Sequence, residues 1–566
     1  MTEQAQLQPL AVDAFGSRPK IVRLPDGVLL AFAPDAGPLA ARRSLDHGRS
    51  WSAAAPVLSA ADLPVGITGV TEALVDAAGE LHLFLLEQWR PDARGEAERG
   101  GVGAYAGWRI DIWYLRSSAE RTVWSAPRRL WEGYTGALNS VIQLRSGRLV
   151  LPFSCYTQRT WADRGDGLDA FTFTGSFDCV SLCSDDGGDH WALSAPLRLP
   201  TPDITYAYGA CEPVVLERRD GRVWMLIRSQ TGRFWESFSP DGYDWSPPRP
   251  TAIVSSDSPA GLVRLPDGRL VLLWNACQRH PYAYGGRHVL HAALSADDGR
   301  TWRGWREVAR DPQRHLPPPP SGDHGTAYPF PVVTGDGAVL VCTGQGEGRT
   351  ILSRLAPDYL LATRQTTDWA RDLDDWSVFG TRGVALRASA DSPGGLALQL
   401  RRTDRQFPAA AVWNLPLGPV GHLRLRLRRH GPVDDLVVLL TDHFSPPFDA
   451  EADLHAVFAG RLAGTEPGHP DALAIEPTPW PTAEPWCECR LRWSLPAGEC
   501  VVEIGQQPVA HWPLRRRGPG VCYLRLRVDA AGPQTGAWQV AQIEADVSDS
   551  WRLEPPRHEQ AGTGIL

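Results

Sequence analysis

The amino-acid sequence predicts an all-β chain: a six-bladed β-propeller followed by a β-sandwich of the jelly-roll or lectin-like kind. Three observations carry this prediction. A motif of the form Ser-x-Asp-x-Gly-x-x-Trp recurs four times, a glycine-centred hairpin recurs six times, and strand patterns continue beyond the last repeat without either motif. Short strands and turns repeated at blade-sized intervals favour a propeller over a single sandwich.

The first motif suits the tip of a β-hairpin. Its Asp can accept hydrogen bonds from backbone N–H groups of its own turn, its Gly can adopt a positive φ, and its Trp can pack back on the sheet. The third copy is one residue shorter than the others, and a degenerate fifth copy runs from Ser117 to Trp124. The four copies are Ser44–Trp51, Ser184–Trp191, Ser239–Trp245 and Ser295–Trp302.

The second repeat is a hairpin whose turn glycine lies between two apolar runs, as in residues 21–32 and 262–273. Six such hairpins, five of them followed by the Asp motif or its remnant, predict six four-stranded blades. The turn glycines are Gly27, Gly79, Gly147, Gly221, Gly268 and Gly337. The blades are expected near residues 15–60, 65–130, 135–200, 205–250, 255–310 and 325–365, with the first and last blades joined.

The propeller is expected over residues 10–365, which leaves room for a second domain. Alternating patterns such as residues 423–428 and 523–528 predict a β-sandwich over residues 366–552. We expect this domain to be structural first, with its Trp residues in the core, packing against the propeller and supporting a homo-oligomer; glycan binding is the alternative. Residues 553–566, rich in Gly, Pro and charge, are expected to be a flexible tail.

Composition excludes several classes of function. The net charge of −8, with no basic stripe, argues against nucleic acid as a partner. Lys20 is the only lysine, which argues against Schiff-base chemistry. The ten cysteines lack zinc-ligand spacing, so no metal is expected. Without a signal-like N-terminus or an apolar span, the sequence as it stands predicts a cytoplasmic protein without membrane partners, or a secreted one if a signal peptide was trimmed.

The Asp motif resembles the aspartate box of the sialidase (neuraminidase) superfamily, the BNR-repeat glycoside hydrolases, and the resemblance covers nearly all of residues 15–365. Arg18, in Phe-Gly-Ser-Arg-Pro, matches the arginine of the family's Arg-Ile-Pro-like motif, with Ile missing. Glu212 and Arg228 flank a hairpin as the family's Glu and second Arg do. Arg287 precedes the strand that leads to an aspartate box, and Tyr328 opens the strand of the last blade.

The resemblance implies a retaining exo-glycosidase, similar to exo-α-sialidases, that releases a terminal acidic sugar such as sialic acid from a glycan. It implies Tyr328 as nucleophile, Glu212 as its base, and Arg18, Arg228 and Arg287 as a clamp on the sugar carboxylate. Arginines suit this task because they form charge-assisted, partly bidentate bonds to carboxylates. A neutral tyrosine avoids the repulsion that a carboxylate nucleophile would meet. No metal or organic cofactor is needed.

The general acid stays open at this stage. The family places an Asp in the loop after the first hairpin, where Asp35 is the candidate in a shortened loop. Glu72 and Asp111, both on the second blade, are fallback acids that we interpret as structural charges, and His324 is a further candidate.

Two aromatic and proline-rich segments lead into Arg287 and Tyr328 and are expected to line the pocket. Tyr282 could stack on a sugar ring, and His324 could hydrogen-bond a hydroxyl. These segments do not match the sialidase pattern. Two alternatives therefore stay open: a hydrolase or lyase of another acidic, uronic-acid-containing glycan, or a non-catalytic carbohydrate-binding propeller.

Overall fold

The computed structural model describes residues 7–10, 15, 17–33, 37–58, 63–64, 66–89, 109–158, 175–200, 209–277, 286–316, 324–346, 348–379, 382–449, 451–465, 475–481, 486–529 and 532–548. Their regular structure is almost entirely strand, interrupted by short 3₁₀ helices, which confirms the predicted all-β class. Across these ranges no helix has the length and hydrophobicity needed to cross a membrane.

Contacts between residues divide the chain into two compact units, and each is described by itself. Unit 1 comprises Met1–Asp298, Val308–Asp311 and Pro319–Tyr359. Unit 2 comprises Gly299–Glu307, Pro312–Pro318 and Leu360–Leu566.

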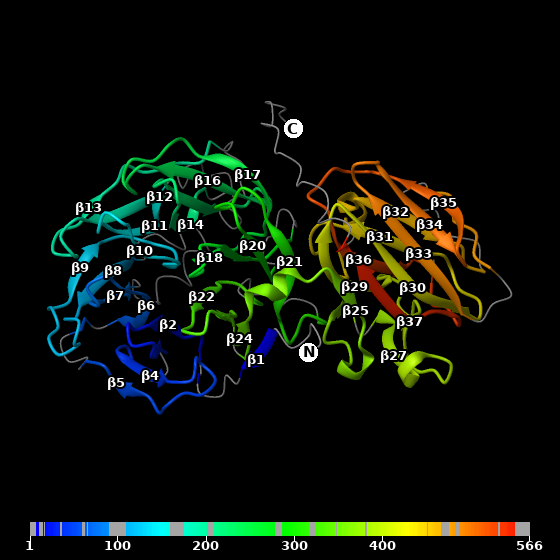
Figure 1. Cartoon of the computed structure of the whole chain (residues 1–566), viewed down its shortest axis with the longest axis horizontal. Helices are drawn as coiled ribbons and strands as arrows, with labels where there is room; N and C mark the ends of the chain where they lie inside the picture. The colour runs from blue at the N-terminus through cyan, green and yellow to red at the C-terminus, as the bar shows by residue number, and fades with distance from the viewer. Residues whose placement is uncertain are drawn as a thin grey trace, which may run out of the picture. The chain divides into compact units, whose positions relative to one another are not determined.

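The described residues from Lys20 to Arg310 form five four-stranded sheets, each built from strands that neighbour one another in chain order (Figure 1). This order is what successive hairpins produce. The sheets are β2–β5 (Lys20–Arg23, Leu29–Phe32, Ala40–Ser44, Ala55–Pro56), β6–β9 (Ile67–Val75, Leu81–Trp89, Arg109–Arg116, Arg128–Trp131), β10–β13 (Ile142–Gln143, Leu149–Gln158, Gly175–Ser184, Ala192–Leu193), β14–β17 (Cys211–Glu217, Val223–Arg228, Arg233–Ser239, Arg249–Val254) and β18–β21 (Gly261–Arg264, Leu270–Trp274, Val289–Ser295, Arg303–Arg310).

A sixth four-stranded sheet combines the two ends of this part of the chain. Its order is β1-β24-β23-β22, with β22 at Phe330–Val333, β23 at Val339–Thr343 and β24 at Ile351–Leu355. Strand β1 (Leu7–Leu10) pairs antiparallel with β24, from Leu7 opposite Leu355 to Leu10 opposite Leu352. The N-terminal strand thus supplies the fourth strand of the last sheet.

The hydrophobic core of unit 1 lies between successive sheets. Val22 and Leu83, from the first and second sheets, share one buried cluster. Equivalent clusters join the second sheet to the third and the third to the fourth. Leu340 of the sixth sheet shares a cluster with Ile21 and Leu29 of the first, so the packing also joins the last sheet to the first.

The six glycine hairpins predicted from the sequence are confirmed. In the second, Asp76 N–H donates to the Glu80 carbonyl at 3.0 Å and Gly79 N–H donates to the Asp76 carbonyl at 3.0 Å. The same two backbone bonds recur in the other five hairpins. All six turn glycines have φ between 81° and 94°, a region that costs glycine far less than other residues.

The first three aspartate boxes have the predicted hydrogen bonds from backbone N–H groups to the box aspartate. In the first box, Ser44 Oγ and Ser50 N–H donate to Asp46 Oδ1 at 2.8 and 2.9 Å, and Gly48 has a φ of 86°. The bond from the box serine to the box aspartate measures 2.9, 3.0 and 2.8 Å in the other three copies. Each box ties the turn between the third and fourth strands of a sheet.

Unit 2 contains two larger sheets and several short 3₁₀ helices. The first sheet has the order β27-β28-β37-β30-β33-β34-β35, with β25 also pairing β37, and the second has the order β26-β29-β36-β31-β32. The strands of the first are β25 (Arg364–Thr366), β27 (Val384–Ala388), β28 (Leu396–Leu400), β30 (Val420–His430), β33 (Cys487–Ser494), β34 (Glu499–Ile504), β35 (Gln507–Pro513) and β37 (Ala537–Asp546). Those of the second are β26 (Trp376–Val378), β29 (Ala409–Gly418), β31 (Leu436–Thr441), β32 (Phe458–Leu462) and β36 (Val521–Val528). The 3₁₀ helices described in unit 2 are Trp369–Arg371, Pro393–Gly395 and Ala452–His455, and a further one, Pro357–Leu361, crosses from unit 1 into unit 2.

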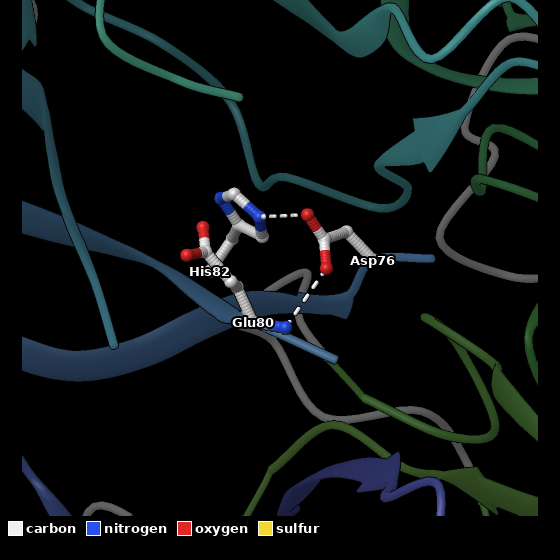
Figure 2. A group of neighbouring side chains, drawn as sticks. All are labelled: Asp76, Glu80 and His82. Atoms are coloured by element: carbon white, nitrogen blue, oxygen red, sulfur yellow. Dashed lines mark hydrogen bonds and ion pairs between the residues drawn. The ribbon is translucent and has the colours of Figure 1, made fainter. Parts of the chain in front are cut away.

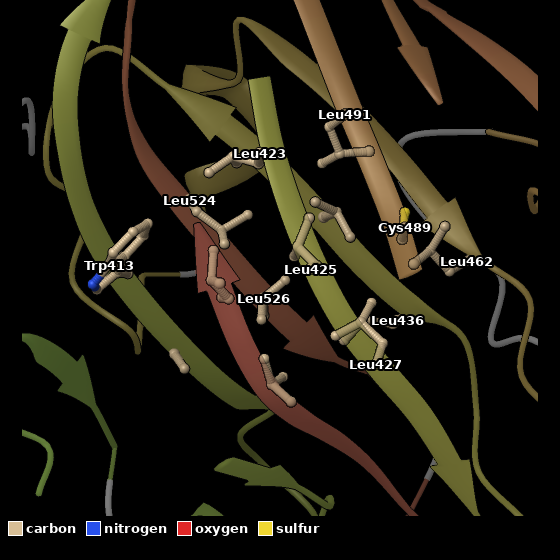
Figure 3. Close-up of a cluster of buried hydrophobic side chains, with 14 of the residues drawn as sticks. Trp413, Leu423, Leu425, Leu427, Leu436, Leu462, Cys489, Leu491, Leu524 and Leu526 are labelled. Carbon is tan, nitrogen blue, oxygen red and sulfur yellow. The ribbon is translucent and has the colours of Figure 1, made fainter. Parts of the chain in front are cut away.

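Alternating side chains of the two sheets form one buried core in unit 2. Leu423, Leu425 and Leu427 of β30 point inward, together with Leu524 and Leu526 of β36, as Figure 3 shows. The intervening arginines of β30 at positions 424 and 426 are exposed, so the strand has the period of two expected for one buried face. Five of the six tryptophans assigned to this core from the sequence are buried, namely Trp413, Trp480, Trp493, Trp512 and Trp538. All ten cysteines are free thiols.

Candidate active site

Tyr328 lies two residues before β22, in a backbone conformation that is rare for a residue with a side chain. Its φ is 59°, and Pro329 follows it. The Tyr328 hydroxyl donates to Glu212 Oε1 at 3.0 Å and accepts a hydrogen bond from Arg228 Nη1 at 3.1 Å. The phenol therefore lies between an acceptor that can take its proton and a fixed positive charge.

Glu212 reaches Tyr328 because of a β-bulge in β14. Cys211 pairs with Arg228 and Val214 pairs with Leu226, so Glu212 and Pro213 together oppose a single residue of β15. The φ of Glu212 is 43°. Bulges of this kind redirect a side chain near functional sites. Glu212 Oε1 also accepts the backbone N–H of Ala137 at 3.2 Å.

Gly136, next to that backbone donor, makes room for the Glu212 side chain. A Cβ atom at position 136 would lie 2.9 Å from Glu212 Cγ and 3.2 Å from Glu212 Oε1. Any larger residue at position 136 would displace the carboxylate.

Arg228 ends β15, directly across the hairpin from Cys211, and binds two carboxylates. Its Nη1 contacts Glu212 Oε2 closely, and its Nε donates to Asp257 Oδ1 at 2.6 Å. Both ion pairs are buried, so the guanidinium is held in one orientation.

Asp257 connects Arg228 to Arg287. The Asp257 carbonyl oxygen accepts from Arg287 Nη2 at 2.6 Å, while Arg287 Nη1 donates to Gln345 Oε1 at 2.8 Å. Arg287 is fully buried, and its guanidinium carbon lies 5.8 Å from the centre of the Tyr328 ring. Neither Asp257 nor Gln345 was singled out from the sequence, since neither lies in a recurring motif.

Arg18 approaches the Tyr328 ring from the segment before β2. Its guanidinium carbon lies 5.1 Å from the ring centre of Tyr328 and 4.8 Å from that of Phe330. Its Nη1 donates to the carbonyl oxygens of Gly344 at 3.1 Å and Ala327 at 3.4 Å. Within the described ranges, no carboxylate pairs with Arg18.

Burial shifts the pKa values of two members of the cluster, Tyr328 and Arg18. Burial raises the pKa of Tyr328 well above its usual value of 10.0; the charge of Glu212 raises it further, and Arg228 and Arg287 oppose the rise. Burial also lowers the pKa of Arg18, while the nearby Tyr328 and Glu212 raise it. The phenol is therefore neutral at physiological pH, and Arg18 is a cation in surroundings that favour an anionic partner.

The structure thus brings together five of the residues predicted from the sequence: Arg18, Glu212, Arg228, Arg287 and Tyr328. With Asp257, they form a cluster of three guanidinium groups, two carboxylates and a phenol. These side chains leave one positive charge unbalanced among themselves. The arrangement can bind an anion and transfer a proton from Tyr328 to Glu212.

The other predicted site residues lie elsewhere or outside the described part. Asp35 and Tyr282 fall outside the described residues. His324 is buried four residues before Tyr328, with its ring centre 5.6 Å from that of His288.

The two fallback acids make structural contacts. Glu72 pairs with Lys20 and accepts the N–H of Ala73 at 3.0 Å. Asp111 lies between Arg109 at 2.9 Å and Arg129 at 3.3 Å and also accepts a backbone N–H at 3.0 Å.

The class of this protein follows from a comparison with family models. The model of the BNR repeat-like domain matches residues 35–341, more than half of the chain. The chain therefore belongs to the BNR repeat-like family, and its resemblance to the sialidase superfamily is confirmed. No curated protein matches the chain.

Several solved structures resemble the chain at low identity. A protein of unknown function from Dyadobacter fermentans is 16% identical with a TM-score of 0.44, the match covering 62% of this chain and 98% of that one. A Trypanosoma rangeli sialidase in complex with 2,3-difluorosialic acid is 14% identical with a TM-score of 0.39, covering 96% and 94%. The NanB sialidase of Streptococcus pneumoniae is 13% identical with a TM-score of 0.40, covering 62% and 70%.

Proposed function

We propose that the protein is a retaining exo-glycosidase that releases a terminal acidic sugar, sialic acid first, from a glycan. The observation that carries this proposal is the hydrogen bond from Tyr328 to Glu212, 3.0 Å long, with Arg228 in contact with both residues. A tyrosine paired with a carboxylate base among arginines suits a sugar whose own carboxylate would repel an acidic nucleophile.

The six four-stranded sheets are proposed to be the blades of a propeller with this cluster at its axis. Two features support the closed arrangement: β1 completes the sheet of β22–β24, and the core joins the sixth sheet to the first. The two sheets of unit 2, which share one core, are proposed to form the β-sandwich.

In the proposed reaction, Tyr328 attacks the anomeric carbon while Glu212 takes the phenol proton. The raised pKa of Tyr328 makes this base necessary, because the phenol does not ionise by itself near neutral pH. Water then releases the sugar from the tyrosyl intermediate, with overall retention of configuration.

Arg18, Arg228 and Arg287 are proposed to hold the substrate carboxylate. Arg18 contributes most to selectivity for an anion, because it approaches the Tyr328 ring without a carboxylate partner among the described residues. Arg228 and Arg287 are already oriented by Asp257 and Gln345, so binding substrate costs them little conformational freedom.

Asp35 is proposed as the general acid that protonates the leaving oxygen, with His324 as the second candidate. Glu72 and Asp111 are less suited, because each is engaged by neighbouring cations.

A second candidate function is a hydrolase or lyase of another acidic glycan, such as one containing uronic acid. The cluster favours this alternative because the three arginines recognise a carboxylate and not a particular sugar ring. A third candidate is carbohydrate binding without catalysis. It is favoured by the close ion pair between Glu212 and Arg228, which engages the carboxylate proposed to take the phenol proton.

A chromogenic sialoside assay on the full chain, beside a glycan array, tests these functions. We expect turnover by the wild type and loss of turnover in Tyr328→Phe with glycan binding retained. The matched control is Tyr243→Phe, a tyrosine in the third aspartate box Ser239–Trp245, which should keep wild-type activity. Nuclear magnetic resonance identifies which anomer of the free sugar is released first, and this shows whether the anomeric configuration is retained. Glycan binding without turnover would establish the third candidate, a carbohydrate-binding protein without catalysis. An unsaturated, ultraviolet-absorbing product from a uronic-acid glycan would establish the second candidate in its lyase form. Unchanged turnover in Tyr328→Phe would overturn the assignment.

A further inference from the structure

The six glycine hairpins allow an internal comparison, because all six have the same two backbone hydrogen bonds. Three positions matter: the first residue of the turn, the residue four later that closes it, and the residue six later on the following strand. In the second hairpin these are Asp76, Glu80 and His82. The other five sets are Leu24, Val28, Leu30; Leu144, Arg148, Val150; Arg218, Arg222, Trp224; Leu265, Arg269, Val271; and Thr334, Ala338, Leu340.

His82 is the exception at a position that otherwise belongs to the core. The equivalent residues in the other five hairpins are apolar and at most 5% exposed. His82 is also fully buried, and it stands beside two carboxylates that no other hairpin has. The hairpin does not need this polar trio to form, so the trio calls for a different explanation.

The three side chains are neighbours, and the His82 ring faces the Asp76 carboxylate, as Figure 2 shows. One potential ligand atom from each of Asp76, Glu80 and His82 lies within 4.8 Å of the others. Asp76 Oδ1 accepts the Glu80 N–H at 2.8 Å, which fixes the carboxylate and leaves Oδ2 facing His82 Nε2 at 3.3 Å.

The contact between Asp76 Oδ2 and His82 Nε2 is of the ion-pair type, 3.3 Å long, and does not have hydrogen-bond geometry. His82 Nε2 is buried and has no hydrogen-bond partner in the described part of the chain. A separation near 3.3 Å is, however, roughly the edge of a tetrahedron whose centre lies about 2.0–2.1 Å from each ligand, as in zinc sites. The other ring nitrogen, Nδ1, lies 2.8 Å from the Tyr114 hydroxyl. Metal-ligating histidines are oriented by such a partner on their second nitrogen.

We propose that Asp76, Glu80 and His82 bind a divalent transition-metal ion, with Zn²⁺ the best fit, at a site separate from the Tyr328 cluster. One imidazole and two carboxylates suit zinc, whereas calcium and magnesium prefer oxygen ligands only. The fourth position is open to water from the side of Glu80, whose side chain is 32% exposed. This proposal does not depend on the proposed glycosidase activity.

Arg116 is the group that opposes a cation here. Its Nη1 lies 3.9 Å from Glu80 Oε2. Its charge is shared, since Nη2 donates to Asp189 at 2.7 Å and Nη1 contacts the Gly187 carbonyl. Arg116 therefore leaves Glu80 able to turn toward the metal.

The proposal is tested by titrating the metal-stripped full-length protein with Zn²⁺ in a calorimeter. Elemental analysis then checks how much zinc the protein holds. We expect one zinc per chain and a rise in melting temperature with added Zn²⁺. His82→Leu should abolish binding, and it should fold because two equivalent hairpins carry leucine at this position. Glu80→Gln, a change at a partly exposed side chain, should weaken binding at least tenfold, and Tyr114→Phe should weaken it about tenfold.

The matched control is His190→Asn, which removes a histidine 2.7 Å from Asp186 in an exposed pair that has no third potential metal ligand among the described residues. It should bind zinc as the wild type does. If the wild type fails to bind zinc, the trio is only a buried polar contact. The same conclusion follows if His82→Leu and Glu80→Gln bind zinc as tightly as the wild type does.

Discussion

Glu212 and Tyr328 share a hydrogen bond 3.0 Å long, and each holds a left-handed backbone conformation directly before a proline. Such a conformation costs a non-glycine residue roughly 1–3 kcal/mol and persists only where the surroundings impose it. Two strained residues, one in β14 and one just before β22, therefore meet at one hydrogen bond. This coincidence supports a site whose geometry is set in advance of ligand binding.

The ionisation of Tyr328 is a first prediction. Because burial raises its pKa, the stability that the neutral phenol contributes is complete below the ordinary tyrosine pKa near 10 and is lost as pH rises through the folded-state value. We expect the difference in phenolate absorbance between wild type and Tyr328→Phe to stay flat up to about pH 10. A phenolate signal below that pH, absent from Tyr328→Phe, would contradict the raised pKa.

Asp257→Asn should weaken the arginine clamp without removing a substrate contact. The change takes the charge from the partner of Arg228 Nε but keeps the backbone carbonyl that binds Arg287. A hydrogen bond between charged groups is worth about 1.5–3 kcal/mol, so KM for an acidic substrate should rise tenfold or more, with a smaller change in kcat. Asp257→Glu should restore part of the affinity. An equal fall in kcat and kcat/KM would instead place Asp257 in the chemical step.

The pair of Lys20 and Glu72 should behave as a buried ion pair. Their side chains are 12% and 2% exposed. Removing one partner, as in Lys20→Met or Glu72→Leu, should lower the free energy of unfolding by about 3–5 kcal/mol, because the other charge stays buried. The double variant should recover most of this loss in urea denaturation. If the two single losses simply add, the charges are not coupled.

The aspartate boxes should make stability fall in acid. Burial alone would raise the pKa of Asp46, but hydrogen bonds from Ser50, Ser44 and Arg49 outweigh it and lower the pKa to about 2. Since the folded-state value lies below the ordinary 3.8, this stability is present above pH 3.8 and is lost as pH falls through about 2. Asp46→Asn should flatten the dependence of melting temperature on pH over this window. Asp244→Asn, at an exposed side chain, serves as control and should leave the slope unchanged.

Truncation after residue 366 should yield an unstable fragment. The division by contacts assigns residues 299–307 and 312–318 to unit 2. Glu307 accepts from the Tyr523 hydroxyl at 2.6 Å, and its N–H donates to Asn414 at 3.0 Å. The fragment would lose these buried partners. A soluble, monomeric fragment with a cooperative melting transition would contradict this expectation.

Local patterns predicted the repeating part of the fold well. The aspartate boxes and glycine hairpins depend on hydrogen bonds within about six residues, so the sequence displays them directly. The bulge at Glu212 is less visible, because it depends on the pairing of β14 with β15.

The residues that were missed differ in how visible they are in the sequence. Asp257 lies between strands without a motif, and its importance arises from partners 29 and 30 positions away in the sequence. The trio of Asp76, Glu80 and His82 had a signal, since Asp-x₃-Glu-x-His replaces the pattern of the other five hairpins. Aligning the six hairpins with one another would have revealed it.

The pairing of β1 with β24 has a consequence for the order of folding. Leu10 meets Leu352, so this strand pair closes a loop of more than three hundred residues, with an entropic cost that local hairpins do not incur. During synthesis the first strand has no partner until the ribosome has made the segment around Leu355. The last sheet is therefore completed late. Until β1 pairs with it, β24 has an open edge to which another chain could add.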